Sequence, residues 1–178
     1  MSYSNESKNL ASFEPTGSMM TYLSNTTPDV CPIGTDFTGD YDLVNMKKPE
    51  YKKDFDTLIK LNYTNAINVF RSKDITRSIM FLEPYIQTAL DNNYYYPDIF
   101  NDYGFLLQQA GRNKDAVRIL SLVVKNTPKR AVAYLNLADA YWDAGDKLNA
   151  SLNYKKYISL KADANHDNIP IRAIERSK

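Results

Sequence analysis

The sequence has very few of the residues that build disulfides and metal centres. It contains one cysteine, Cys31, and one histidine, His166. A single cysteine excludes an internal disulfide framework, and the usual zinc sites need about three or four nitrogen or sulfur ligands. The aspartates at 36, 40 and 42 lack the glutamate and loop spacing of a calcium-binding EF-hand, which favours a polar turn. We therefore expect no metal and no cofactor, although a magnesium or calcium site made only of carboxylates stays open.

The chain also lacks an excess of either charge and a long apolar run. It has 22 lysines and arginines against 21 aspartates and glutamates, for a net charge of +1. Nucleic-acid-binding domains normally carry a basic excess or a basic stripe, so we expect no nucleic-acid partner. We also expect no membrane span and no secretory signal, because no segment has the required apolar length or basic head. The protein is then cytoplasmic if this N-terminus is native, and periplasmic or secreted if a signal peptide was removed.

No group of residues has the arrangement of a catalytic site. His166 stands beside Asp167, as a general base stands beside its orienting carboxylate, but this pair lies in a polar linker without a nucleophile. Cys31 has no histidine near it in the sequence. We therefore expect that the protein is not an enzyme and has no catalytic residues.

The composition changes near residue 48. Residues 1–48 are rich in Ser, Thr, Asn, Gly, Pro and Asp, which predicts an irregular or disordered arm in which a short strand at Tyr41–Val44 is conceivable. This arm is either a flexible leader or a segment that packs on the helical body or touches a partner. Residues 49–178 instead carry apolar side chains at steps of three and four, the period of amphipathic helices. The first stripe comprises Phe55, Leu58, Ile59, Ala66, Val69 and Phe70, with the polar Asn62 on the same face, and the second comprises Ile75, Ile79, Leu82, Ile86 and Ala89.

Local signals mark where these helices begin and end. Asp74 offers a side-chain oxygen that can cap the second helix, and Asn92 and Asn93 end its pattern. Pro84 lies inside this helix and is expected to bend or interrupt it, because proline lacks an N–H group and crowds the preceding turn.

Residues 97–128 match the following segment when they are shifted by 34 positions. In this alignment large residues match large ones and small residues match small ones, and Gly111 aligns with Gly145. We expect two helices joined by a tight turn in each segment, with a glycine at the end of the first helix. Asn113 and Asp146 supply side-chain acceptors near the start of the second helix. The remaining matched pairs are Phe100/Tyr134, Tyr103/Leu137, Gly104/Ala138, Leu107/Tyr141, Ala116/Ala150, Leu120/Tyr154 and Val123/Tyr157.

This period, with its aromatic, small, glycine, alanine and proline positions, resembles the tetratricopeptide repeat. Residues 97–128 carry the pattern through Pro128, and residues 131–161 carry it with Ala162 in place of the closing proline. Residues 55–91 resemble a degenerate pair with Lys73 where the glycine would stand. The tail, 167–178, is expected to cap the last pair through Ile169, Ile171 and Ile174, or to be frayed. The predicted fold is all-α: a short solenoid of helical hairpins with an irregular N-terminal arm.

The resemblance also implies a binding surface. In that family the first helix of each pair lines a concave groove that holds a peptide or protein segment. Three of the matching residues here are aspartates and none is basic, so we expect a basic or mixed basic–apolar protein partner. Phe105 and Trp142 add the apolar surface typical of binding anchors. The matching positions are Asn101, Asp102, Phe105, Gln108, Gln109, Leu135, Asn136, Asp139, Trp142 and Asp143.

The sequence leaves two functions open. The first is a non-catalytic module that binds a segment of another protein in the acidic and aromatic groove. The alternative is an immunity or inhibitor protein that neutralises a specific secreted toxin, because the short stand-alone repeat block and the tail NIPIRAIER resemble small bacterial proteins, some of which are encoded beside toxins.

Overall fold

The computed structural model describes residues 10–13, 20–23, 49–163 and 168–178. They belong to two compact units, residues 1–61 and 62–178, and the boundary between the units lies inside a helix. Apart from one strand pair, the elements of the described residues are all helices. They are α1 (Pro49–Arg71), α2 (Ile75–Asp91), α3 (Pro97–Gln109), α4 (Asn113–Asn126), α5 (Ala131–Asp143), α6 (Lys147–Asp163) and α7 (Ile171–Arg176).

The strand pair lies in the segment for which the sequence predicted no regular structure. Strands β1 (Leu10–Phe13) and β2 (Met20–Leu23) pair antiparallel, with Leu10 opposite Leu23. Each strand has only four residues, too few for a period of two to stand out in the sequence. The strand considered at Tyr41–Val44 lies outside the described residues.

The predicted apolar stripes of α1 and α2 are largely the buried faces of these helices. Phe55, Leu58, Ile59 and Ala66 are buried in α1, and the α2 stripe is buried from Ile79 onward. Asp74 caps α2 as predicted, because its Oδ1 accepts a hydrogen bond from the Arg77 N–H at 2.9 Å.

Pro84 does not interrupt α2, which continues as one helix from Ile75 to Asp91. The prediction of an interruption was wrong for a physical reason. Leu82 and Ile86 on either side of the proline are both buried, and their burial favours a continuous helix. The carbonyl that loses its N–H donor belongs to Met80, whose residue is 67 % exposed, so water can satisfy it.

The turns after α3 and α5 have the same geometry, 34 residues apart. Gly111 and Gly145 have φ angles of 75° and 87°, a left-handed conformation that costs glycine little. The N–H groups of Arg112 and Asp146, one residue further on, donate at 2.9 Å to the carbonyls of Leu107 and Tyr141. The shift of 34 that relates the sequences therefore also relates the turns.

The turns before and after α2 place ordinary residues in the same left-handed region. Lys73 has a φ of 63° and Asn93 a φ of 56°. Lys73 thus occupies the conformation that glycine provides in the later turns, as its place in the sequence suggested. A non-glycine residue in this region carries a steric cost, which is smaller for asparagine than for lysine.

The helix-start prediction was right for Asp146 and wrong for Asn113. Asp146 Oδ1 accepts from the Asn149 N–H at 3.0 Å. Helix α4, however, begins at Asn113 itself after Arg112, so Asn113 stands one position too late to cap it. Its buried Oδ1 has no hydrogen-bond partner among the described residues.

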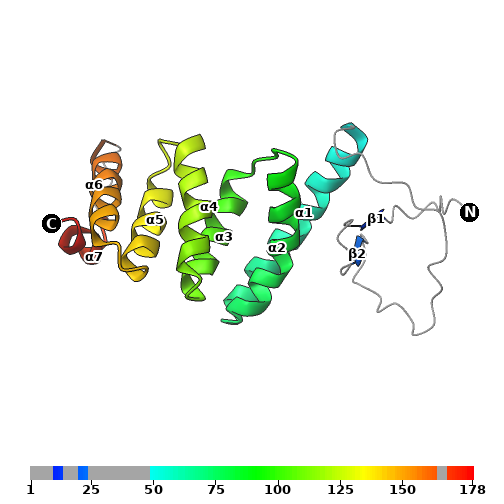
Figure 1. Ribbon diagram of the computed structural model, residues 1–178, viewed down its shortest axis with the longest axis horizontal. Coiled ribbons are helices and arrows are strands. Elements are labelled where there is room, and N and C mark those ends of the chain that lie inside the picture. Colours follow the sequence, from blue (N-terminus) through cyan, green and yellow to red (C-terminus); the bar gives the residue numbers. More distant parts are fainter. Residues whose placement is uncertain (1–9, 14–19, 24–48, 164–167) are drawn as a thin grey trace, which may run out of the picture. The chain divides into compact units, whose positions relative to one another are not determined.

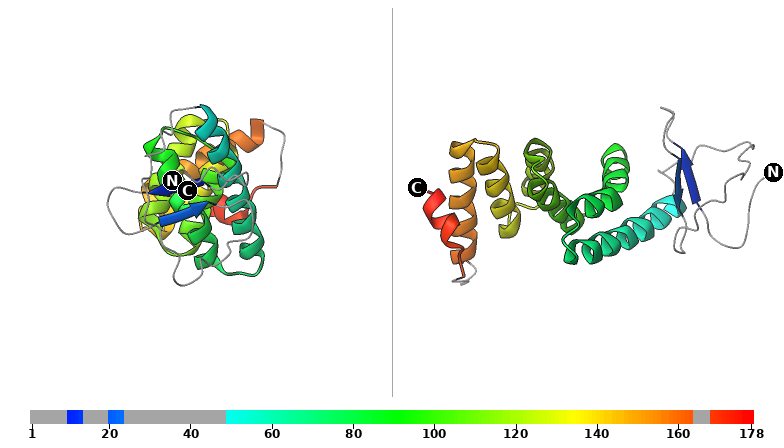
Figure 2. Two further views of the ribbon diagram at one scale, coloured as in Figure 1. Left: turned by 90° about the vertical axis from the view of Figure 1, so that its right-hand side faces the viewer. Right: turned by 90° about the horizontal axis from the view of Figure 1, so that it is seen from below.

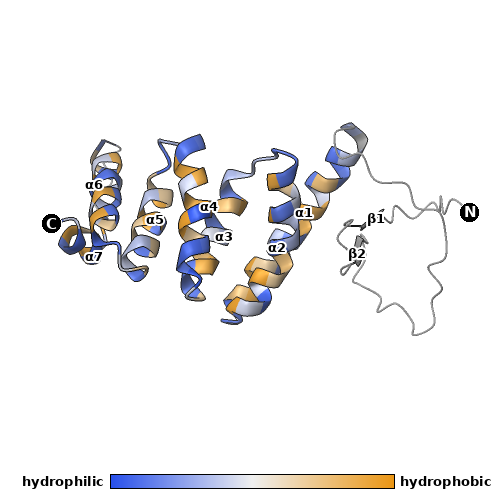
Figure 3. Cartoon of the chain, viewed as in Figure 1, coloured by the Kyte–Doolittle hydropathy of each residue, from blue (hydrophilic) through white to orange (hydrophobic). Residues whose placement is uncertain are grey.

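Within the unit 62–178, helices α2 to α7 pack one on the next in chain order, and α3 also packs on α5 (Figure 1 and Figure 2). Figure 3 shows hydrophobic and hydrophilic residues interleaved along these helices, as amphipathic packing requires. The buried core passes through the matched positions of the repeat. Phe100, Leu107, Ala116, Leu120 and Val123 are all 0 % exposed, as are Ala138, Ala150 and Tyr154 at matched positions of the second segment.

Gly104 marks the closest approach of α3 and α4. A Cβ atom added there would lie 2.5 Å from Leu120 Cγ and 2.7 Å from its Cδ2. Leu120 is fully buried and cannot move aside without disturbing its neighbours. In the next pair Ala138 occupies this position and Tyr154 takes the place of Leu120, so the small residue and its neighbour vary together.

Gly104→Ala is therefore expected to destabilise the protein, although alanine favours a helix by about 1 kcal/mol over glycine. Overpacking costs about 1–3 kcal/mol, which leaves a net loss near 1 kcal/mol. Urea unfolding, monitored through the loss of helical signal, measures this change in the free energy of unfolding. In a Leu120→Ala background the clash is absent, so the same Gly104→Ala change should become stabilising. A stabilising effect in the wild-type background would show that the two helices are not in close contact.

The tail forms the predicted short helix, and of the three isoleucines predicted to attach it, Ile169 does so. Ile171 and Ile174 of α7 are 72 % and 46 % exposed, so they do not cover the end of the last pair. Ala173 is fully buried instead, and Ile169 packs against the cluster of Ala138, Ala150 and Tyr154. Because α7 has only six residues, the buried position at Ala173 leaves the isoleucines on its outer side.

Candidate functional site

The predicted binding residues lie on two helices that pack against each other, α3 and α5. We call these ten side chains together the α3/α5 surface. All lie within the unit 62–178. They comprise Asn101, Asp102, Phe105, Gln108 and Gln109 of α3, and Leu135, Asn136, Asp139, Trp142 and Asp143 of α5.

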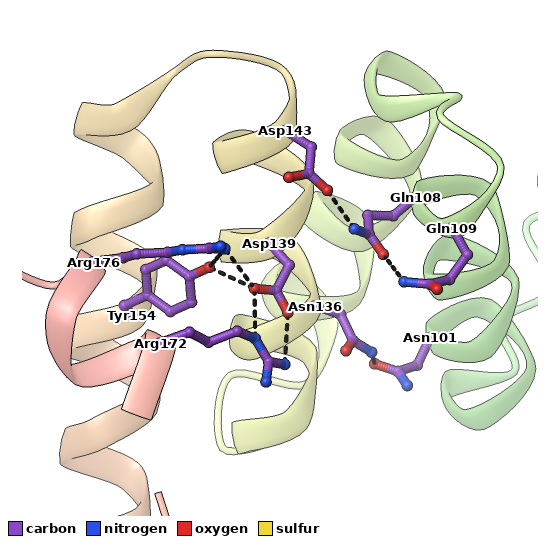
Figure 4. A network of polar contacts seen from close by, with 9 residues as sticks. All are labelled: Asn101, Gln108, Gln109, Asn136, Asp139, Asp143, Tyr154, Arg172 and Arg176. Atoms are coloured by element: carbon purple, nitrogen blue, oxygen red, sulfur yellow. Dashed lines mark hydrogen bonds and ion pairs between the residues drawn. The ribbon is translucent and has the colours of Figure 1, made fainter. Parts of the chain in front are cut away.

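Two hydrogen bonds join the polar side chains of α3 to those of α5 (Figure 4). Asn136 Nδ2 donates to Asn101 Oδ1 at 3.2 Å, and Gln108 Nε2 donates to Asp143 Oδ2. Asn101 is only 2 % exposed, so it serves this link rather than an outside ligand. The sequence placed these residues on one surface but did not indicate that they bind one another. The result is a face whose polar groups are already fixed in position.

The end of α1 contributes two further residues that sequence reasoning did not assign to the surface. Tyr63 Oη donates to Asp102 Oδ2 at 2.6 Å. The Phe70 and Phe105 rings meet edge to face, with their centroids 5.8 Å apart. Burial, together with the hydrogen bond to Asp102, raises the pKa of Tyr63 well above its usual range, so its hydroxyl remains a donor. The seven-residue spacing of Tyr63 and Phe70, which puts both on one side of α1, was the available signal.

Asp139 is the most heavily engaged carboxylate of the surface (Figure 4). Arg172 of α7 binds it with two atoms, Nε to Oδ1 at 3.2 Å and Nη2 to Oδ2 at 3.0 Å. Arg176 Nη1 lies 3.6 Å from Asp139 Oδ1, and the hydroxyl of Tyr154 donates to the same oxygen. Sequence reasoning assigned Asp139 no basic partner, because both arginines lie in the tail, beyond the repeat.

The surroundings of Tyr154 and Arg172 keep both side chains protonated, so that both can donate hydrogen bonds to Asp139. Burial, and then the hydrogen bond to Asp139, raises the pKa of Tyr154 to about 12, so its hydroxyl keeps its proton at neutral pH. The hydrogen bond to Asp139 raises the pKa of Arg172 above its already high value. A charged arginine, a neutral phenol and a carboxylate therefore form one stable network near neutral pH.

Trp142 lies beside this network and contacts cations from two elements. The ring centroid is 3.7 Å from Lys147 Nζ and 4.5 Å from Arg176 Cζ. Cation–π attraction of this kind contributes about 0.5–2 kcal/mol, depending on solvent exposure. Trp142 and Leu135 also pack against the buried cluster of α5, α6 and α7. Trp142 therefore contacts the neighbouring helices α6 and α7.

The outward part of the surface is at the end of the two helices. Gln109 and Asp143 are exposed, and Gln109 Nε2 donates to Gln108 Oε1 at 2.7 Å. Together with half-buried Phe105 and Trp142, these groups offer amide, carboxylate and aromatic contacts. Their chemistry suits hydrogen bonds, ion pairs and cation–π contacts.

The described residues include no group of three or more His, Cys, Asp and Glu side chains arranged to hold a metal ion. Among the helices that the structure describes, none combines the length and the apolar character needed to cross a membrane. The weaker candidates Cys31, Asp36, Asp40, Asp42 and His166 lie outside the described residues.

No protein-family model matches the chain, and no curated protein matches it either.

Proposed function

We propose that this protein is a non-catalytic protein-binding module whose helical pairs are of the tetratricopeptide type. Its α3/α5 surface would bind a basic or mixed basic–apolar segment of another protein. The observation that carries the proposal is the arrangement of α3 and α5: hydrogen bonds between them fix a polar face that also holds two aromatic side chains. Such a face loses little conformational entropy on binding, which favours affinity.

The recurrence of one turn geometry after 34 residues supports the repeat assignment. Gly111 and Gly145 share their left-handed φ and equivalent hydrogen bonds on either side. The small residues Gly104 and Ala138 are also buried at matching points. These features belong to stacked helical hairpins, whose first helices would lie on a common side.

The charge of the surface supports a basic partner. Its three charged residues are all aspartates, and Asp139 already binds two arginines from the same chain. Asp143 is the exposed member and accepts a hydrogen bond from neutral Gln108, the one polar side-chain contact it makes among the described residues. A lysine or arginine of a partner that approached Asp143 would meet an uncompensated carboxylate, which favours rapid association.

Asp143→Lys is expected to weaken partner capture at low salt by about tenfold or more, which corresponds to at least about 1.4 kcal/mol. The chain offers a matched control, Asp91→Lys. Asp91 also stands exposed at the end of a helix and accepts from a glutamine, Gln87, at 2.9 Å. Affinity capture with quantitative mass spectrometry should find proteins retained by the wild type and Asp91→Lys but lost with Asp143→Lys. Equal retention by all three proteins would exclude the α3/α5 surface as the binding site.

A further inference from the structure

Helix α7 is short and is attached largely by polar contacts. It has six residues, fewer than an isolated helix needs to be stable in water. Ala173 is its one buried side chain, and Ile171 and Ile174 point outward. Besides Ala173, the preceding Ile169 packs against the buried cluster. The described polar contacts that hold the helix are those of Arg172 and Arg176 and a hydrogen bond from Ser151 Oγ to the Ser177 carbonyl at 2.9 Å.

These contacts occupy part of the α3/α5 surface. Asp139 stands on α5 between Asn136 and Asp143, which both bind residues of α3, and Figure 4 shows the two arginines reaching Asp139 from α7. Arg172 supplies a two-atom ion pair to Asp139. Arg176 lies over the ring of Trp142 and also donates to Tyr154 Oη at 3.1 Å. A carboxylate and an aromatic ring of the surface thus already bind a pair of arginines.

We propose that α7 is a tethered ligand of the α3/α5 surface, and that the partner is a helical protein segment with two arginines four residues apart that replaces α7 on Asp139 and Trp142. This inference rests on the proposed binding function. The spacing is that of Arg172 and Arg176, which lie on one side of the helix one turn apart. The helix has two polar anchors and one buried alanine, and the adjoining Ile169 is only partly buried, so exchange with an outside helix is feasible.

Tethering sets the strength of this competition. A segment joined to its site by a short linker acts at an effective concentration of about 1 mM. An outside helix that makes only the contacts of α7 must therefore compete against that concentration. A partner would displace α7 by adding contacts to groups that α7 leaves open, such as Asp143 and Gln109 at the exposed end of the surface.

A peptide with the sequence of residues 168–178 tests the inference with the full-length chain. Binding is followed through Trp142, the single tryptophan, whose ring contacts Arg176 and therefore reports on this site. The double variant Arg172→Ser/Arg176→Ser keeps the tail but removes its hold on Asp139. We expect it to bind the peptide at least about tenfold more tightly than the wild type does. Adding Asp139→Asn to the double variant should remove that gain.

Lys155→Ser/Lys156→Ser is the matched control. These two lysines of α6 are exposed, and their replacement causes the same change of net charge without touching Asp139. Peptide affinity of this control should equal that of the wild type. A gain as large as that of the arginine variant would mean that net charge alone governs binding, and would overturn the inference.

If α7 served only to cover the end of the helical stack, loss of its arginines would lower stability without creating a binding site. A folded double variant with unchanged peptide affinity would therefore overturn the inference. Should the double variant fail to fold, Arg172→Ser alone supplies the test, because Arg172 is 46 % exposed and Arg176 remains in place. A gain of about threefold is expected for it, and no gain in the folded single variant counts equally against the proposal.

The two proposals can fail separately. Asp143 makes no described contact with α7, so the capture experiment with Asp143→Lys leaves the tail unchanged. Capture that depends on Asp143, without a gain of peptide binding in the arginine variants, would keep the binding function and overturn the tethered ligand. A gain of peptide binding that depends on Asp139 supports the tethered ligand, and the absence of any captured protein would then count against the binding function alone.

Discussion

Tyr154→Ala is expected to lower the free energy of unfolding by about 4 kcal/mol, because aromatic side chains removed from a core cost about 3–5 kcal/mol. Tyr154 is the largest of the fully buried side chains and is 0 % exposed. It packs in the cluster with Ala138, Ala150 and Ala173, whose small side chains cannot fill the space that its loss would leave. Urea unfolding, monitored through the loss of helical signal, measures this loss of free energy.

Tyr154→Phe is the control that separates the ring from its hydroxyl. It keeps the packing and removes the hydrogen bonds with Asp139 and Arg176. A loss of about 1–2 kcal/mol is expected, since Asp139 keeps its two arginines. If the alanine and phenylalanine variants unfolded at the same urea concentration, the polar network rather than the packed ring would be the main stabilising feature of this position.

Ala150→Leu should lower the free energy of unfolding by about 3 kcal/mol, at the upper end of the usual cost of overpacking. Ala150 is 0 % exposed and lies on α6 in the same cluster as Ala138 of α5, so a larger side chain would force the two helices apart. Ala116, its counterpart on α4, is equally buried, and Ala116→Leu should have a similar effect.

Ala162→Leu is the matched control for this overpacking. It makes the same substitution in the same helix, α6, at an exposed position. Leucine and alanine differ little in helix propensity, so its effect should stay within about 0.5 kcal/mol. Urea unfolding of the three variants compares their free energies of unfolding. If Ala162→Leu lost as much as the two buried variants, helix propensity rather than close packing would explain the destabilisation.

The sequence alone was sufficient to find the helices and the turns after α3 and α5. Side-chain burial repeats with the helical period, so an apolar residue every three or four positions predicts both the helix and its inner face. A left-handed turn after a helix strongly favours glycine, so Gly111 and Gly145 were visible as turn residues. These are local rules, and each depends on residues within a few positions of one another. They failed at Asn113, which is the first residue of its helix and not the cap, and they failed for the interruption at Pro84, where the burial of neighbouring residues favours a continuous helix.

The sequence also predicted which residues of α3 and α5 share a helix face, because equivalent repeat positions repeat with the helical period. It did not predict their partners. Asn136 binds Asn101, and Asp139 binds Arg172, across more than thirty residues of sequence. No periodicity relates a polar side chain to a partner on another helix, because that contact depends on how the helices pack and on how far each side chain reaches. The sequence therefore determined the helical hairpins and the composition of the surface, whereas only the tertiary structure decided that α7 places two arginines on Asp139.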